Sequence, residues 1–232
     1  MIQVNKDGSK CQKCKLKSKA VQVLTKDELD ILEKGCLDVH LNDGEKIFTE
    51  DLPHSHVVYL KAGFAKIHMM GPNGRDQILK IARPGAFMGI QTILGGKINH
   101  YSATALHDIR ACYINVGIFK ELIKKSGEFA SEILTYICHE ELIYYRRFVD
   151  RQQKQINGRL ADAIIYFADE IYEKQTFTMP FAHMDLAALI GTTRESVTRA
   201  LKDFKEGKIV KVTGREFSII NYEMLRKISE SG

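Results

Sequence analysis

The sequence contains no long hydrophobic run. It never approaches the about 18 consecutive apolar residues that a membrane-spanning helix needs, and its lysine-rich start lacks the apolar stretch of a secretory signal. Cysteine is also scarce, with five residues in 232, an odd number. This is too few for a disulfide-stapled scaffold and fits a reducing compartment, where thiols are free, metal-bound or redox-active. We therefore expect a cytoplasmic protein with no membrane partner.

The chain also has no large excess of positive or negative charge. The formal net charge is only +5, and 44% hydrophobic with 27% charged side chains suit one large or two small folded domains. Six lysines at the start face a single acid, Asp7, and hold most of the excess: Lys6, Lys10, Lys13, Lys15, Lys17 and Lys19. The rest is nearly balanced, so affinity for a polyanion such as DNA depends on where the cations are placed.

A short helix followed by a β-rich region is predicted for the first half of the chain. Helical spacing over residues 24–32 begins with the N-cap candidate Thr25, and Glu28 three residues later completes a capping box. Residues 39–116 contain short β-type runs separated by turn dipeptides, which predicts a roll, barrel or sandwich. Asn73-Gly74 is a strong hairpin signal, because both residues tolerate the positive φ of a tight turn.

A long helix is predicted over residues 118–151, where no glycine or proline follows Gly127. Four apolar side chains form one stripe at about 100° per residue and are assigned to the predicted dimer contact: Ile133, Ile137, Tyr144 and Phe148. Other apolar side chains lie off that stripe: Leu134, Leu142, Ile143 and Tyr145. One neighbour cannot cover both sets, so we expect contacts with the chain's own β domain and with the same helix of a second copy. A core helix within one chain is the alternative.

A helix, a tight turn and a second helix are predicted over residues 184–201. Gly191 suits the turn, Thr193 can cap the second helix, and Glu195 is favourable in its first turn. A polar stretch at residues 152–155 separates this region from the long helix. The last eighty residues therefore form a separate small α+β unit.

The second of these helices has one apolar and one polar face. The apolar face consists of Val197, Ala200, Leu201 and Phe204. The polar face consists of Glu195, Thr198, Arg199 and Lys202. Arginine can donate two hydrogen bonds to guanine, glutamate can accept one from cytosine, threonine can touch a thymine methyl, and lysine suits phosphate. A solvated face with a Glu195–Arg199 ion pair fits the same spacing.

A β-hairpin is predicted directly after this helix pair. Residues 208–220 contain two short β-type runs around a glycine turn. A helix-turn-helix followed by such a wing is a DNA-binding layout, so the sequence predicts double-stranded DNA as a partner.

Residues 186–209 resemble the signature of the CRP/FNR family, named after the cyclic AMP receptor protein and the fumarate-nitrate regulator. Other matching motifs occur in family order: Leu60-Lys61-Ala62-Gly63, Arg83-Pro84-Gly85-Ala86-Phe87-Met88-Gly89, Ser102-Ala103-Thr104-Ala105 and Gly158-Arg159-Leu160-Ala161. The resemblance implies an α+β fold with an N-terminal β-roll, a double-stranded β-helix of the cyclic-nucleotide-binding type. It further implies a long dimerisation helix and a C-terminal winged helix-turn-helix. The expected protein is a homodimeric bacterial transcription regulator with RNA polymerase as a further partner, not an enzyme.

The resemblance also assigns positions in the chain. Its DNA-reading positions correspond to Arg194, Glu195, Thr198 and Arg199, and the predicted DNA-binding set adds Ser196 and Lys202. Because Thr198 stands where the FNR branch has serine and the CRP branch glycine, a half-site of the TTGA type is implied. The expected segments are a Lys/Cys-rich start (1–24), a β-roll sensor domain (25–120), a dimerisation helix (121–153) and a DNA-binding domain (154–232).

The expected effector pocket departs from the cyclic-nucleotide pattern of the family. Its residues are Phe87, Gly89, Ile90, Tyr101 and Ser102. Family members that bind cyclic nucleotides have glutamate after the loop glycine and arginine before the Ser-Ala pair. Here Ile90 and Tyr101 occupy those positions, and a buried phosphate without a guanidinium partner is unfavourable. We therefore do not expect a cyclic nucleotide.

The FNR branch instead holds an iron-sulfur cluster with three N-terminal cysteines and one from the roll. Cys11 and Cys14 resemble the first pair, and Cys112 lies where the roll cysteine is expected. The third N-terminal cysteine is missing, so a cluster would need Cys36 or a non-cysteine ligand. Nearby lysines favour thiolates and hence metal binding or oxidation. A tail without metal, with Cys36, Cys112 and Cys138 as ordinary buried residues, is the alternative.

Two further alternatives are considered from the sequence. His54-Ser55-His56 resembles the histidine pair of cupin-type metalloenzymes, but the expected downstream glutamate is absent. Haem or nitric oxide sensing has four candidate histidines: His40, His68, His100 and His107. The effector stays unidentified at this stage, with an iron-sulfur cluster, haem and thiol oxidation all open.

Overall fold

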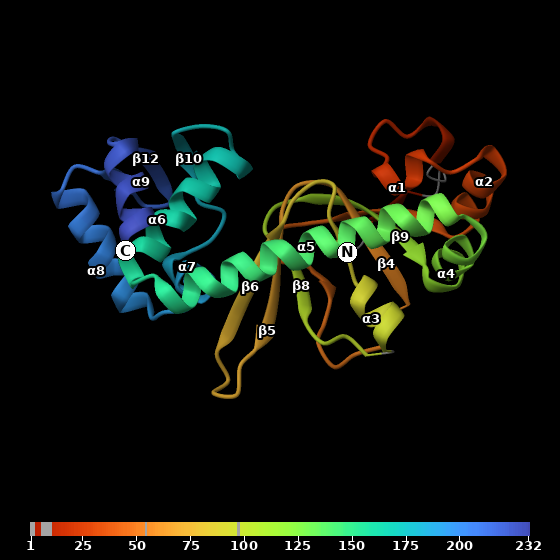
Figure 1. The fold of residues 1–232 in the computed structure, drawn as a ribbon, viewed down its shortest axis with the longest axis horizontal. Coiled ribbons are helices and arrows are strands. Elements are labelled where there is room, and N and C mark those ends of the chain that lie inside the picture. Colours follow the sequence, from red (N-terminus) through yellow and green to blue (C-terminus); the bar gives the residue numbers. More distant parts are fainter. Residues whose placement is uncertain (1–2, 6–10, 54, 97) are drawn as a thin grey trace. The chain divides into compact units, whose positions relative to one another are not determined.

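The computed structural model describes residues 3–5, 11–53, 55–96 and 98–232, with the backbone alone for residues 3–5 (Figure 1). The described residues form two compact units. One contains the chain up to Met70 together with Leu79–Leu142, and the other contains Gly71–Ile78 together with Ile143–Gly232. The division therefore falls inside a β-hairpin and inside the long helix, and the segment limits expected from the sequence stay a prediction.

Strands predominate in the first half of the described chain and helices in the second. The strands of the first half are β1 Gln3–Asn5, β2 Cys36–Leu41, β3 Lys46–Phe48, β4 His56–Ala62, β5 Ala65–Met70, β6 Asp76–Ala82, β7 Phe87–Met88, β8 Ser102–Ala105 and β9 Ile109–Asn115. The helices up to the long one are η1 Cys11–Lys13, α1 Lys19–Gln22, α2 Lys26–Lys34, α3 Ile90–Gly95, α4 Val116–Lys125 and α5 Gly127–Gln153. The rest of the chain contains α6 Ile156–Tyr166, η2 Phe167–Ile171, β10 Thr176–Thr178, α7 His183–Ile190, α8 Arg194–Glu206, β11 Val210–Thr213, β12 Glu216–Ile219 and α9 Tyr222–Ser231.

Two antiparallel sheets form the β-roll. One has the strand order β1-β2-β9-β4-β7 and the other β3-β8-β5-β6. Alternate residues of the strands point to opposite faces, and one set of apolar side chains fills the space between the sheets. This core includes Val39, Leu41, Val58, Leu60, Ile109 and Ala111. The α+β fold with an N-terminal β-roll, as expected from the resemblance, is confirmed.

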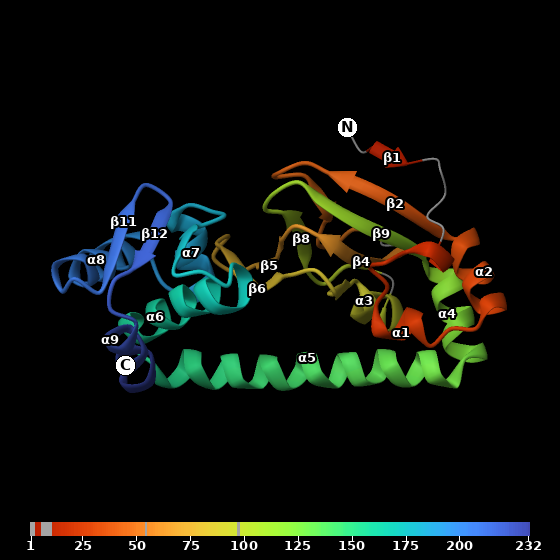
Figure 2. The ribbon, with the colours of Figure 1, turned by 90° about the horizontal axis from the view of Figure 1, so that it is seen from above.

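The opposite face of the five-stranded sheet is covered by helices. Figure 2 shows α2 and α4 together at one end of β2 and β9. Phe119 of α4 and Phe129 of α5 meet there with ring centroids 5.5 Å apart, and both are fully buried. This second core supports the sheet from outside the roll and includes three cysteines, Cys11, Cys36 and Cys112.

Local signals in the sequence were accurate for two elements. The capping box of α2 is present, with the Thr25 hydroxyl accepting from the Glu28 backbone and the Glu28 carboxylate accepting from Thr25. The predicted hairpin joins β5 to β6, and Gly74 in its turn has φ of 67°. Both depend on residues close in sequence, which is why they could be predicted.

The single long helix predicted over residues 118–151 is wrong in its first part. Two helices are present, because α4 ends at Lys125 and Ser126 adopts an extended conformation with φ −113° and ψ 104°. The Ser126 hydroxyl accepts a hydrogen bond from the Phe129 backbone and so caps α5. The capping ability of serine and the presence of Gly127 at the start of α5 explain the break.

The second unit is a winged helix-turn-helix with an aromatic core. Its three-stranded sheet has the order β10-β12-β11, and β11 and β12 form the predicted wing around Gly214. Phe177 stacks on Phe217 at 5.9 Å and on Phe167 at 6.3 Å. Among the described residues, no helix is long and apolar enough to cross a membrane.

Candidate nucleic-acid interface

The turn between α7 and α8 has the geometry that its sequence predicts. Gly191 ends α7 in the left-handed region with φ of 69°, where a residue without a Cβ is favoured. Thr193 then caps α8, since its hydroxyl accepts a hydrogen bond from the Ser196 backbone at 3.2 Å. The Arg159 guanidinium on α6 donates to the Gly191 carbonyl at 3.4 Å. These contacts fix the direction in which α8 leaves the turn.

The two faces of α8 divide as predicted. The inner side chains are buried: Val197, Ala200, Leu201 and Phe204. The outer side chains are exposed, so α8 presents a polar surface while its apolar face belongs to the core.

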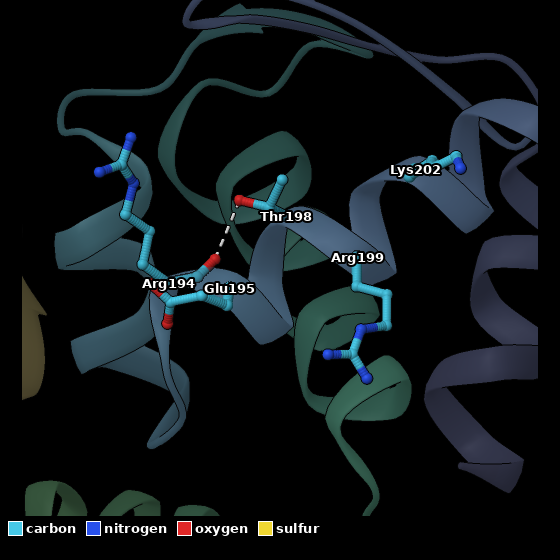
Figure 3. A pocket seen from close by; sticks show the side chains of 5 residues that line it. All are labelled: Arg194, Glu195, Thr198, Arg199 and Lys202. Carbon is cyan, nitrogen blue, oxygen red and sulfur yellow. Dashed lines mark hydrogen bonds between the residues drawn. The ribbon is translucent and has the colours of Figure 1, made fainter.

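An open pocket on α8 is lined by five side chains, which Figure 3 shows: Arg194, Glu195, Thr198, Arg199 and Lys202. The Arg194 and Arg199 guanidiniums extend in different directions from the helix (Figure 3). The Thr198 hydroxyl donates a hydrogen bond to the Arg194 carbonyl at 2.9 Å. Lys202 lies 3.7 Å from Glu206, an exposed ion pair that a phosphate can replace. The surface thus combines two planar donors with one flexible cation.

The N-terminus of α8 adds further polar groups. A backbone hydrogen bond and then one from Thr193 lower the pKa of Glu195, which therefore stays ionised and accepts hydrogen bonds at neutral pH. Ser196 is turned toward the cap, because its hydroxyl lies 3.1 Å from that of Thr193. Of the predicted DNA-binding residues, Ser196 alone is outside the pocket lining.

The comparisons with known proteins agree with this layout. Residues 158–228 match the model of the Crp-like helix-turn-helix domain, and residues 38–126 match the cyclic nucleotide-binding domain. A CRP-like cAMP-activated global transcriptional regulator of Mycobacterium tuberculosis is 23% identical over 84% of this chain and 89% of its own length. The chain belongs to the CRP/FNR family of transcription regulators.

Two further relatives extend the match over nearly the whole regulator. The fumarate and nitrate reduction regulatory protein of Vibrio cholerae is 22% identical over 94% of this chain and 90% of its own length. A solved structure of a Crp/Fnr-family regulator from Eubacterium rectale has the same fold, with a TM-score of 0.79, 17% identity and coverage of 90% of this chain and 97% of that one. The relatives are DNA-binding regulators and not enzymes, which decides against the cupin-type alternative.

The expected effector pocket is occupied by the regulator's own tyrosine. The Tyr101 hydroxyl accepts a hydrogen bond from the Gly89 backbone at 2.9 Å and donates one to Gln91 at 3.0 Å. Ile90, in the position of the expected glutamate, is 1% exposed and belongs to the apolar core. Ser102 accepts from the Glu50 backbone at 3.0 Å. The backbone donor next to Ile90 is therefore already satisfied.

Phe87, the remaining predicted pocket residue, is connected to the long helix. Its backbone donates to the Tyr136 hydroxyl at 2.9 Å, and that hydroxyl donates back to the Phe87 carbonyl at 3.2 Å. Burial raises the pKa of Tyr136 to a value far above neutral, so the hydroxyl keeps its proton. Tyr136 could not be found from local sequence patterns, because its partner Phe87 lies 49 residues away.

The cysteines considered for an iron-sulfur cluster differ in burial, with Cys11, Cys36 and Cys112 in one apolar core. Among the residues that the structure describes, no group of three or more His, Cys, Asp or Glu side chains is arranged to hold a metal ion. Cys14 is half-buried, whereas Cys112 shares a hydrogen bond with the Lys61 ammonium.

The histidines considered from the sequence have other surroundings. His54 lies outside the described residues, and His56 contacts Ser55 at 2.9 Å and the Tyr113 ring at 5.9 Å. His68 lies 2.9 Å from the Thr104 hydroxyl. His107 packs against the Phe64 ring at 6.2 Å. His40 and His100, the other two candidates, are exposed.

The four residues of the predicted dimer stripe on α5 differ in burial. Ile133 is 2% exposed in the core of the first unit, and Ile137 packs against the same core. Tyr144 and Phe148 are exposed. Ile133 and Ile137 therefore face the regulator's own β domain, and the assignment of these two residues to a dimer contact needs correction.

Other apolar side chains of α5 are exposed. With exposed Cys138 between the first two, they follow one another at spacings of four, four, three and four residues: Leu134, Leu142, Tyr145 and Val149. On a helix these positions fall within about 80° of one another, and Phe148 lies beside them. Residues that the sequence placed off the stripe thus form the uncovered face.

Proposed function

We propose that this regulator is a homodimer that recognises a palindromic operator through the outer face of α8. The main observation behind this proposal is that one face of α8 is buried and the other exposes five polar side chains: Arg194, Glu195, Thr198, Arg199 and Lys202. Two such helices related by a two-fold axis fit DNA half-sites that are one turn of the double helix, about 34 Å, apart. The same proposal includes RNA polymerase as a further partner and a cytoplasmic location, because bacterial DNA lies in the cytoplasm.

A half-site of the TTGA type fits the chemistry of this face. The Thr198 hydroxyl is engaged by the helix backbone, which leaves its methyl group for contact with a thymine methyl. Arg199 can donate two hydrogen bonds to guanine, and ionised Glu195 can accept from cytosine. Ser196, held at the cap, supports the geometry of the helix start in this scheme.

The homodimer is proposed from the uncovered face of α5. Exposed leucine, tyrosine and valine at helical spacing are unfavourable in water, and the same face on a second copy covers them symmetrically. Dimerisation by this helix also brings two recognition helices into one molecule. Leu142, Tyr145 and Val149 are the proposed central contacts.

The proposed effector is not a cyclic nucleotide. Tyr101 occupies the Gly89 donor, and Ile90 offers no partner for a ribose hydroxyl. We expect calorimetry with cyclic AMP and cyclic GMP to show no binding at micromolar concentration. Micromolar affinity for either nucleotide would contradict this part of the proposal.

The experiment for DNA recognition compares two variants of α8. If Arg199 contacts a guanine, Arg199→Ala weakens binding by about 1–3 kcal/mol per half-site and relaxes preference at one base pair. Lys202→Ala is the matched control. It weakens binding to all DNA sequences by a similar factor, and it lowers the slope of log affinity against log salt concentration by about one unit per phosphate contact removed. Selection on random DNA with wild type and both variants measures these effects. An Arg199→Ala protein that keeps the wild-type base preference would show that the reading face is misassigned.

A further inference from the structure

The C-terminal turn of α7 presents backbone carbonyl groups that the helix itself cannot use. A helix leaves its last four carbonyls without a partner inside the helix, and in α7 these begin at Ala187. The Ala187 carbonyl accepts from the Gly191 and Thr192 backbones of the turn. The next two carbonyls, of Ala188 and Leu189, accept from side chains of other elements. The end of α7 is therefore held from outside the helix-turn-helix.

Gln77 holds the first of these two carbonyls. Its side-chain amide donates a hydrogen bond to the Ala188 carbonyl, 111 residues further along the chain. Gln77 lies near the start of β6, in the segment Gly71–Ile78, which belongs to the second unit together with α7. The contact thus lies within the second unit, and no local pattern in the sequence indicates it.

Arg151, in the last turn of α5, holds the second carbonyl. Its Nη2 atom donates to the Leu189 carbonyl at 2.8 Å and to the Ile78 carbonyl at 2.9 Å. One guanidinium group thus ties the end of α7 to β6. Arg159 of α6 donates to the Gly191 carbonyl, so side chains from three elements hold this end of α7.

The charge of Arg151 has no carboxylate partner among the described residues. Its hydrogen-bond acceptors are two backbone carbonyls, and the neighbouring guanidiniums of Arg147 and Arg159 repel it. Burial, and then the Arg147 charge, lower the pKa of Arg151, but a guanidinium keeps its proton at neutral pH. The compensating charge is the C-terminus of α7, where the peptide dipoles place a partial negative charge. The position of Arg151 is therefore explained by this helix end and not by an ion pair.

These contacts lie directly before the turn to the recognition helix. Leu189 is two residues before Gly191, the C-cap of α7, and Thr193, the N-cap of α8, is two residues after it. Because so short a turn transmits a rotation of α7 to α8, the carbonyl contacts limit the directions in which α8 can point. A side chain that reads a base must be held within about 0.5 Å of the required place. Contacts at the end of α7 can therefore decide how well α8 reads bases.

We propose that Gln77 and Arg151 are positioning residues for sequence-specific DNA binding. They hold the end of α7 so that α8 presents its outer face in one direction. This role rests on the proposed reading role of α8, and it adds residues from two elements outside the helix-turn-helix. Neither side chain touches DNA in this scheme. Loss of either therefore weakens binding to the correct sequence more than binding to DNA in general.

The test uses the full-length protein and two duplexes, one selected from random DNA by the wild type and one with the same bases in scrambled order. We expect Arg151→Met to lower affinity for the selected duplex about tenfold, as for lost hydrogen bonds of a charged group. Affinity for the scrambled duplex, and the slope of log affinity against log salt concentration, should not change. An equal loss on both duplexes with a smaller slope would show a phosphate contact by Arg151 and would overturn the proposal.

Two further variants keep the charge or the contact separate. Gln77→Leu removes an uncharged donor, and we expect it to lower affinity for the selected duplex about threefold. Arg151→Lys retains the charge but replaces the planar fork by a point charge, so its affinity should lie between those of wild type and Arg151→Met. Wild-type affinity in Arg151→Lys would show that charge alone suffices and would contradict a positioning role. Circular dichroism confirms folding of each variant.

Arg147→Met is the matched control. Arg147 lies one turn earlier on α5, and its guanidinium lies over the Tyr166 ring at 5.2 Å from the centroid. This variant removes the same charge from the same helix without removing a donor to α7, so we expect wild-type affinity for both duplexes. A loss of selectivity equal to that of Arg151→Met would attribute the effect to net charge and overturn the proposal.

Hydrogen exchange without DNA measures the hold on α7 directly. The Thr192 amide donates to the Ala187 carbonyl, so its exchange reports opening of this helix end. We expect about tenfold faster exchange at Thr192 in Arg151→Met, with the Leu225 amide of α9 unchanged as a measure of the unit's overall stability. Unchanged exchange at Thr192 would contradict the hold on α7. Faster exchange in a protein whose wild type prefers no DNA sequence would instead show that the proposed reading role of α8 has failed.

Discussion

The recognition helix and the cysteine cluster of the first unit bring their side chains together in opposite ways. The five side chains of the outer α8 face lie within one stretch of helix, residues 194–202, and are exposed. The cluster takes Cys11, Cys36, Lys61 and Cys112 from four separate elements and buries them. The first arrangement follows from helical periodicity, whereas the second depends on strand register. The comparison teaches that an exposed face can be read from local sequence and a buried cluster cannot.

The largest effects are expected from matched truncations in the two cores. Phe204 is 2% exposed in the second unit and Phe129 is fully buried in the first. We expect Phe204→Ala and Phe129→Ala each to lower stability by about 3–5 kcal/mol, because each leaves a cavity. If the units are separate cores, Phe204→Ala weakens DNA binding and leaves the hydrogen exchange of the first unit unchanged. Thermal unfolding followed by unit-specific mass labelling measures this, and equal loss of both properties would break the comparison.

The buried carboxylate of the cluster should produce the next largest effect. Burial alone would raise the pKa of Asp38, but the Arg110 hydrogen bond and Lys61 outweigh it and hold that pKa below its usual value of 3.8. Its ionisation therefore stabilises the fold above about pH 4, and this contribution is lost as the pH falls through the lowered pKa. We expect Asp38→Asn to cost about 3 kcal/mol at pH 7, because Lys61 loses its carboxylate.

The control for Asp38 is an exposed ion pair. Lys125 and Glu121 on α4 are 2.7 Å apart, and both are well exposed. Glu121→Gln should cost less than about 1 kcal/mol, since solvent screens such pairs. Urea unfolding at pH 7 and at pH 3 compares the variants. An Asp38→Asn protein with the wild-type dependence on pH would show that this pair does not contribute.

The uncovered face of α5 connects the two regions through the proposed dimer. Leu142 is 64% exposed, and we expect Leu142→Glu to raise the dimer dissociation constant by about a hundredfold, or about 2.7 kcal/mol. Ile137→Glu has a different outcome, because Ile137 packs in the first unit's own core and its change lowers stability. Light scattering and sedimentation distinguish the two. A Leu142→Glu protein that dimerises as tightly as wild type would exclude this face.

The smallest effects are expected at two helix caps, one in each unit. Thr25 caps α2 and Thr193 caps α8 through hydroxyl contacts to the backbone. We expect each threonine-to-alanine change to cost about 1 kcal/mol, measured by urea unfolding. Thr193→Ala should also weaken DNA binding, since Thr193 fixes the start of the reading helix, whereas Thr25→Ala should not. A loss of DNA affinity in Thr25→Ala alone would reverse this part of the comparison.

The sequence was most informative where interactions are local. Gly191 and Thr193 predicted the turn and the cap of α8, and the structure has both with the expected geometry. The capping box of α2 and the hairpin at Gly74 were predicted for the same reason. Each of these signals depends on residues at most a few positions apart, where backbone preferences decide the conformation.

Prediction was poorer where two neighbours compete for one element. The apolar positions of α5 indicated two partners, but not which residues face which one. Ile133 turned out to be buried in its own unit, while Leu142 and Tyr145 are exposed. Periodicity gives the angle of a side chain around a helix and says nothing about what packs against it. The break at Ser126 was missed because serine is compatible with both a helix and a cap.

The sequence by itself determined the family, the β-roll and winged-helix plan, and the outward face of α8. Only the tertiary structure decided that Lys61 is buried and that Cys11, Cys36 and Cys112 lie in one core. The physical reason is the register of β2, β4 and β9, in which a shift of one residue would turn Cys36, Lys61 or Cys112 to the other face of the sheet. Register depends on the packing of the whole core, so it cannot be read from any short stretch of the chain.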